Sequence, residues 1–92
     1  MARHEAEAIH LTDRERSELE LLARRRSAPQ AQVERARIIL LADTGVGVRA
    51  TAARLGIGRA TVRRWRRRWL QAPVDWAVSE RLSDAPRSGT PP

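Results

Sequence analysis

The 92-residue sequence contains no cysteine, lysine, tyrosine or phenylalanine. Without cysteine, the chain can form no disulfide, no thiolate zinc site and no cysteine nucleophile. Without lysine, it has no P-loop lysine and can form no Schiff base. The longest apolar run, residues 38–42, is far too short to span a bilayer, and the first ten residues lack the apolar core of a secretory signal. We therefore expect a cytoplasmic protein with no membrane partner.

The positive charge of the chain is concentrated in one short block. Eighteen arginines stand against eleven acidic residues, for a formal net charge of +7. Residues 49–69 hold eight of these arginines and no acidic residue, whereas the acids and arginines of residues 1–48 balance. A concentrated block of one sign is typical of phosphate-binding surfaces. The expected partner is therefore double-stranded DNA, with association to the nucleoid.

Four helices are predicted before residue 73, and no segment of that part alternates as a strand does. A capping box of Thr12 and Glu15 marks the start of the first helix. Gly45 is a predicted C-terminal cap of the second. The predicted helices cover residues 13–26, 29–43, 49–55 and 59–70. Apolar side chains at helical spacing, such as Leu19 with Leu22 and Ala36 with Ile39, are expected to form the core.

The chain divides into three predicted parts. Residues 1–10 are expected to be a flexible N-terminal arm, and residues 11–72 the all-α domain. Residues 73–92 end in a stretch rich in proline, serine and glycine that favours a flexible linker leading to further domains. The triplet 24–26 is three arginines, which we interpret as the solvated end of the first helix. The alternative is a contact of this triplet with backbone phosphate.

The third and fourth predicted helices have the arrangement of a helix-turn-helix. A three-residue turn, Gly56-Ile57-Gly58, joins them. Ala52 is small where the two helices would come closest, and Gly56 can adopt the left-handed conformation that the turn needs. The fold class predicted is thus an all-α, homeodomain-like helix-turn-helix bundle of about four helices.

The fourth predicted helix has one apolar and one basic face. Val62, Trp65 and Trp69 recur at i, i+3 and i+7 and are expected to face the core. The opposite face is expected to enter the major groove, and it carries Arg59, Ala60, Arg63, Arg64 and Arg67. A membrane-active helix with Trp among Arg would look similar, but it would need no Ala52 and Gly56 ahead of it.

Arginine suits base reading because its planar fork can bond O6 and N7 of guanine together. Arg59, Arg63 and Arg64 are the predicted base contacts, and Arg67 is predicted to contact either bases or phosphate. Phosphate contacts are predicted for the surrounding arginines, Arg49, Arg54, Arg66 and Arg68. The amide of Gly58 and the first amides of the fourth helix are further candidates for a phosphate.

Catalytic or metal chemistry has little support in the sequence. The spacing of His4, Glu5 and His10 does not place two ligands one helical turn apart. Nothing in their predicted helices brings Asp13, Glu34 and Asp43 together. We therefore predict no catalytic residue, no metal site and no cofactor.

Five segments resemble bacterial insertion-sequence transposases of the mariner-related superfamily, and together they run from Leu11 to Gly89. The segments are residues 11–16, 23–30, 34–42, 52–65 and 82–89. The glycine-turn segment is generic to helix-turn-helix proteins, whereas Arg-Ser-Ala-Pro-Gln and Asp-Ala-Pro-Arg-Ser-Gly are much more specific. Thr51 stands where this family usually has an apolar residue, so weaker packing of the third helix is expected.

The resemblance implies a module that binds the terminal inverted repeats of a mobile element. In such transposases a ribonuclease-H-like domain supplies the catalytic carboxylates, and this sequence stops before it. The expectation is therefore a truncated or split transposase that does not cut DNA by itself. Its candidate partners are a second copy of the chain or a catalytic subunit from an adjoining frame. The alternative reading is a free-standing helix-turn-helix transcriptional regulator.

Overall fold

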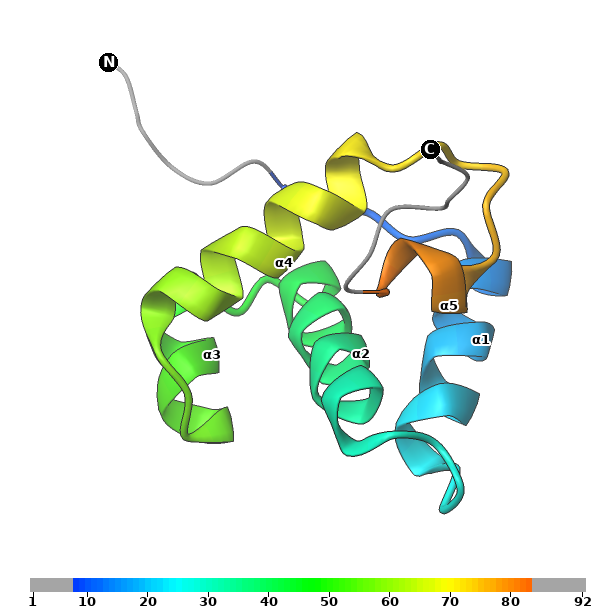
Figure 1. Cartoon of the computed structure of the whole chain (residues 1–92). Helices are drawn as coiled ribbons and strands as arrows, with labels where there is room; N and C mark the ends of the chain where they lie inside the picture. Colours follow the sequence, from blue (N-terminus) through cyan, green and yellow to red (C-terminus); the bar gives the residue numbers. More distant parts are fainter. Residues whose placement is uncertain (1–7, 84–92) are drawn as a thin grey trace, which may run out of the picture.

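The computed structural model describes residues 8–83, most of which lie in five helices. These are α1 (Asp13–Arg24), α2 (Gln30–Asp43), α3 (Val48–Leu55), α4 (Arg59–Gln71) and α5 (Val78–Arg81). Figure 1 shows α2 in the middle, with α1 on one side, α3 on the other and α4 across the top. The described residues contain no strand, so the all-α prediction is confirmed.

The helix ends follow the local signals in the sequence. The Thr12 hydroxyl accepts a hydrogen bond from the Glu15 amide, and the Glu15 carboxylate accepts one from the Thr12 amide, each at 3.0 Å. Gly45, just after α2, has φ +92° and donates its amide hydrogen bond to Ala42. Helix α1 ends two residues earlier than predicted because the backbone of Arg25 is already extended. The chain has to reverse direction there before α2.

The core lies between α1, α2 and α4. Leu19 and Leu22 of α1 are buried, as are Val62, Trp65 and Trp69 of α4. Helix α2 is buried around more of its circumference than predicted, because α1, α3 and α4 all pack against it. Ile38 is therefore fully buried, although helical periodicity places it off the face that Ala36 and Ile39 share.

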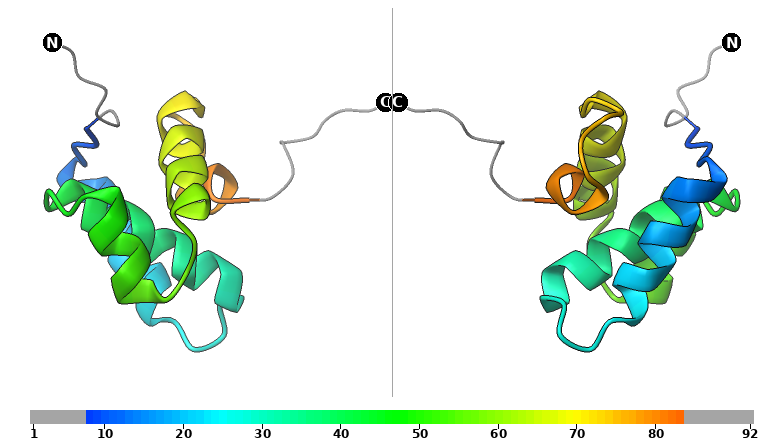
Figure 2. Two further views of the ribbon diagram at one scale, coloured as in Figure 1. Left: turned by 90° about the vertical axis from the view of Figure 1, so that its left-hand side faces the viewer. Right: turned by 90° about the vertical axis from the view of Figure 1, so that its right-hand side faces the viewer.

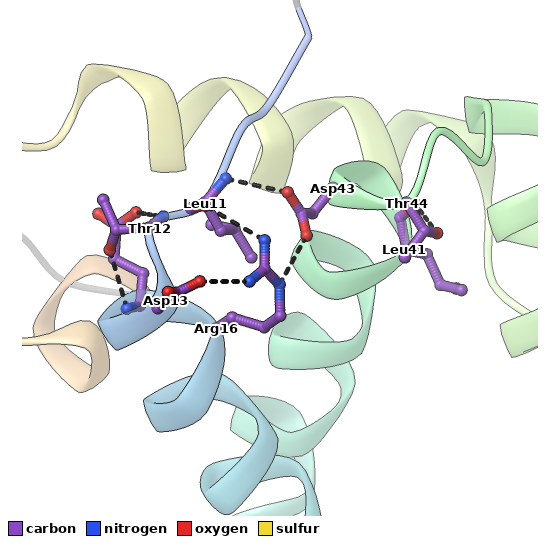
Figure 3. Close-up of polar contacts among 8 residues, drawn as sticks. Leu11, Thr12, Asp13, Arg16, Leu41, Asp43 and Thr44 are labelled. Carbon is purple, nitrogen blue, oxygen red and sulfur yellow. Dashed lines mark hydrogen bonds and ion pairs between the residues drawn. The ribbon is translucent and has the colours of Figure 1, made fainter.

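The N-terminal arm is shorter than predicted, because residues 9–11 are anchored to the core. The side chain of Ile9 is only 2% exposed, and Leu11 is buried as well. The Leu11 amide donates to Asp43 at 2.9 Å, and Arg16 donates to both the Leu11 carbonyl and Asp43 (Figure 3). These bonds from Leu11 and Arg16 outweigh the burial of Asp43 and hold its pKa below the usual value. Residues 1–7, with His4 and Glu5, lie outside the described residues.

The first part of the predicted C-terminal linker folds onto the bundle. Val78 and Leu82, four residues apart, are both buried against the core. The prediction missed α5 because one helical turn is too short to show a periodic pattern. In Figure 1, α5 is the short orange helix beside α1 and beneath α4. The prediction of a linker is thus wrong for residues 78–83, while residues 84–92 lie outside the described part.

Arg81 holds α5 in place through three contacts. Its Nη1 forms an ion pair with Glu15 Oε2 at 2.9 Å, and its Nη2 donates to the carbonyl of Trp69 at 2.9 Å. Its guanidinium carbon also lies 3.6 Å from the centroid of the Trp69 ring. Arg81 therefore joins α5 to the start of α1 and the end of α4.

Thr51 in α3 is fully buried, and its hydroxyl has no hydrogen-bond partner among the described residues. A buried hydroxyl without a partner costs roughly 1–3 kcal/mol. We expect Thr51→Val, which has nearly the same shape, to raise the free energy of unfolding by about 1 kcal/mol. Urea titration followed by circular dichroism would measure this change.

The matched control is Thr51→Ser, which keeps the hydroxyl and removes only the methyl group. It should lower the free energy of unfolding, because it leaves a small cavity. A loss of stability in Thr51→Val would show instead that the hydroxyl is bonded in solution.

Candidate nucleic-acid interface

The turn between α3 and α4 has the geometry that the sequence predicts. Gly56 ends α3 with φ +69° and ψ +36°, a left-handed conformation that residues with a side chain rarely adopt. The amides of Gly56 and Ile57 both donate to the carbonyl of Ala52. Ile57 is half-buried and packs against the core, so the turn is anchored by its central side chain. These contacts fix the direction in which α4 leaves α3.

Helix α4 divides into a buried and an exposed face as predicted. Val62, Trp65 and Trp69 are buried, with Trp65 only 3% exposed. The predicted outward residues are all exposed, and they are Arg59, Ala60, Arg63, Arg64 and Arg67. The left view of Figure 2 looks at the side of the molecule formed by α3 and α4. Because the two indoles hold one face of α4 against the core, the opposite face with the arginines is exposed to solvent.

The exposed arginines of α3 and α4 are available to a ligand. Arg49 and Arg54 of α3 are exposed like the four outward arginines of α4, and neither helix contains an acidic residue. None of these six guanidinium groups forms a hydrogen bond or ion pair with another described residue. Their one recorded contact is that of Arg64 with the Trp65 ring, at 5.8 Å from its centroid. The N–H donors of these six guanidinium groups are therefore exposed to solvent and not used by the described part of the chain.

Arg66 is not part of this exposed surface, and the prediction of a phosphate contact is wrong for it. Its residue is only 8% exposed, and its Nη1 donates to the carbonyl of Val46 at 3.3 Å. Burial lowers the pKa of its guanidinium below the usual value. The sequence carries a signal for this placement: Arg66 lies four residues after Val62 and three before Trp69, which puts it on the buried side.

Arg68 also has a role inside the fold. It is half-buried, and its Nη2 donates to the carbonyl of Ser83 at 2.8 Å. Arg68 and Arg35 both contact the Trp65 ring, at 4.8 and 4.0 Å from its centroid, and Arg35 donates to the carbonyl of Leu82. The two arginines hold the C-terminal segment on Trp65. Arg68 thus has a structural role in the fold, and its contact with phosphate stays a prediction.

The first turn of α4 is open to an anion. Gly58 is the N-cap residue and is exposed, so no side chain caps the helix. The first turn contains no acidic residue either. The positive end of the helix dipole and the first free amides lie beside Arg59. This placement is compatible with the predicted phosphate contact at Gly58.

The acidic residues of the described part do not gather into a metal site. No group of three or more His, Cys, Asp or Glu side chains is arranged to hold a metal ion within residues 8–83. Asp13 and Asp43 do approach each other, against expectation, because both form ion pairs with Arg16. Their charges are thus met by a guanidinium. Across the same range, no helix is long and apolar enough to cross a membrane.

Part of the chain matches a known protein family. Residues 29–73 match the family model of the homeodomain-like domain. The matched segment, which we call the homeodomain-like region, contains all of α2, α3 and α4. The chain thus carries a helix-turn-helix region of the DNA-binding type, in the predicted all-α, homeodomain-like fold. No curated protein and no solved structure shows significant similarity to the chain.

Proposed function

We propose that the chain binds specific sequences of double-stranded DNA through the exposed face of α4. The observation that carries this proposal is the set of six exposed arginines on α3 and α4, with no acidic residue between them and no ion pair within the described residues. In the homeodomain-like fold the last helix of the helix-turn-helix enters the major groove. The exposed face of α4 would therefore meet base edges.

The arginines of this surface divide by position into base and phosphate contacts. We assign Arg59, Arg63 and Arg64 to base edges, because they lie in the first half of α4, the end that enters the groove first. Arg67 lies one turn further along and is assigned to bases or phosphate. Arg49 and Arg54 of α3, together with the Gly58 amide, are assigned to phosphates.

The specific role we propose is recognition of the terminal inverted repeats of a mobile element, as the DNA-binding module of a transposase. Its support is the resemblance of residues 26–30 and 84–89 to insertion-sequence transposases. In this proposal a catalytic subunit from an adjoining frame, or a second copy of the chain, is the protein partner. The chain alone binds DNA without cleaving it.

Selection of binding sites from a pool of random duplexes tests this role. We expect one enriched motif, and its genomic copies should lie at the ends of an insertion element. Copies placed upstream of promoters would instead support a free-standing transcriptional regulator. Enrichment of no motif would contradict sequence-specific binding.

Arg63→Ala should weaken binding to the selected duplex by about 1–3 kcal/mol if the guanidinium reads a guanine through two hydrogen bonds. The loss should be much smaller on random duplex, because only the base contact is removed. Fluorescence anisotropy on both duplexes measures the difference. The matched control is Arg25→Ala, an exposed arginine beyond the end of α1. Equal losses on the two duplexes would make Arg63 a phosphate contact.

A further inference from the structure

A second basic surface lies where α1, α2 and α3 meet. It is a groove of about 540 Å³ that is open to solvent, and none of its lining residues comes from α4. Four apolar side chains line its floor: Ala23, Leu40, Leu41 and Leu55. All four are half-buried, and Ala23, Leu40 and Leu55 pack on the core from this side. The groove therefore exposes apolar surface from three helices in one place.

Three arginines surround this apolar floor. Arg24 of α1, Arg37 of α2 and Arg54 of α3 are exposed and line the groove. None of them forms a hydrogen bond or ion pair with another described residue. Glu20 lines the same groove, yet it forms no ion pair with Arg24 one turn along the helix. The residues around the groove thus carry three positive charges and one negative charge.

We propose that this groove binds an acidic amphipathic helix of a protein partner. An apolar stripe on such a helix would cover Leu40, Leu41 and Leu55, and carboxylates on its flanks would meet the three arginines. Charge complementarity decides the sign of the partner's charge, because the three guanidinium groups repel a basic segment and attract an acidic one. The proposal is independent of the transposase role and concerns a face that α4 does not reach.

The apolar floor makes this groove better suited to a protein helix than to DNA. A duplex backbone presents phosphates that would satisfy the arginines, but it has no apolar surface to cover three leucines. Protein helices that bind in grooves instead use anchors at i, i+3, i+4 and i+7. Arg54 is the one residue that the groove shares with the proposed phosphate contacts, so Arg37 is the better position for a test.

The test uses the full chain, labelled with nitrogen-15, and a synthetic peptide of about 15 residues with a leucine stripe flanked by glutamates. We expect the peptide to shift the amide signals of Ala23, Leu40, Leu41 and Leu55 together. Replacing the glutamates of the peptide by glutamine should abolish most of this binding. Arg37→Glu should weaken the affinity about tenfold, because it turns an attraction into a repulsion.

The matched control is Arg25→Glu, which reverses the charge of an exposed arginine that does not line the groove. It should leave the affinity within about twofold. Equal weakening by both variants, or peptide-induced shifts away from the groove, would overturn the proposal. A random-sequence duplex provides the second comparison: it should shift the signals of α4 and of α3 around Arg49 and Arg54, but not those of Leu40 and Leu41 in α2. A duplex that shifted Leu40 and Leu41 as strongly as the peptide would also overturn it.

Discussion

Trp65→Ala is expected to lower the free energy of unfolding by about 3–5 kcal/mol, which is most of the stability of a domain this small. The indole is 3% exposed and lies on the inner face of α4, against the side chains of the core cluster. Its removal leaves a cavity that the surrounding helices can fill only in part. We expect a urea transition that is shifted to low denaturant or no longer cooperative.

The effect of Trp65→Ala should extend beyond the cavity. Arg35 and Arg68 lie against the two-ring system of Trp65 while they donate to the carbonyls of Leu82 and Ser83. Loss of the ring therefore also loosens the segment that follows α5. Amide exchange in residues 78–83 should rise more than in α1, and DNA binding should fall with the fraction of folded chain.

The control for this experiment is Leu21→Ala. Leu21 is 56% exposed, so its truncation should change the free energy of unfolding by less than about 0.5 kcal/mol. A wild-type-like, cooperative melt of Trp65→Ala would contradict the assignment of this indole to the core.

Arg81→Ala is expected to lower the free energy of unfolding by about 2–4 kcal/mol, because it removes a buried charge and leaves its partner behind. The side chain of Arg81 is 4% exposed and that of Glu15 is 20% exposed. Water can reach the orphaned Glu15 in part, so we expect the lower half of this range. The same change also removes the hydrogen bond to the Trp69 carbonyl and the contact with the Trp69 ring.

The pKa of Glu15 gives this prediction a second readout. Burial by itself would raise the pKa of this carboxyl group, but hydrogen bonds from the Thr12 amide and Arg81 outweigh it and hold the pKa below the usual value. Arg81→Ala should therefore raise the pKa of Glu15, as measured by carbon-13 titration. An unchanged pKa would contradict the ion pair, whatever happens to stability.

An exposed ion pair of the same chain serves as the control. Arg14 and Glu18 pair at 3.2 Å on the surface of α1, where the Arg14 side chain is 84% exposed. Arg14→Ala should cost no more than about 0.5 kcal/mol, because solvent screens such pairs. A similar cost for Arg14→Ala and Arg81→Ala would mean that α5 is not held by a buried charge.

Local signals in the sequence predict helices α1 to α4 and the division of α4 into a buried and an exposed face. The capping box at Thr12, the glycines at 45 and 56 and the Val62–Trp65–Trp69 spacing all act within a few residues, so they can be read without the fold. The exposed arginine face of α4 follows from the same spacing, because helical periodicity places Arg59, Arg63 and Arg67 opposite the indoles. Its contact with DNA remains a prediction.

The prediction was wrong where a residue's role depends on another part of the chain. The charge of Arg66 predicts a phosphate contact, yet Arg66 is buried and donates to the carbonyl of Val46, 20 positions away. Arg68 likewise donates to the carbonyl of Ser83, a contact that its charge does not predict. The sequence predicts a flexible arm at Ile9, because nothing near it along the chain indicates burial, yet its side chain lies in the core. Helix α5 is only four residues long, and its contact with Glu15 spans 66 positions.

The sequence by itself thus determined helices α1 to α4, the glycine turn and the concentration of arginine in residues 49–69. The tertiary structure decided which arginines can reach a ligand. Packing turned Arg66 inward and set Arg35, Arg68 and Arg81 against tryptophan rings, while it left Arg59, Arg63, Arg64 and Arg67 unpaired by any described acid. The physical reason is that charge is a property of a residue, whereas exposure depends on which distant segments pack against it.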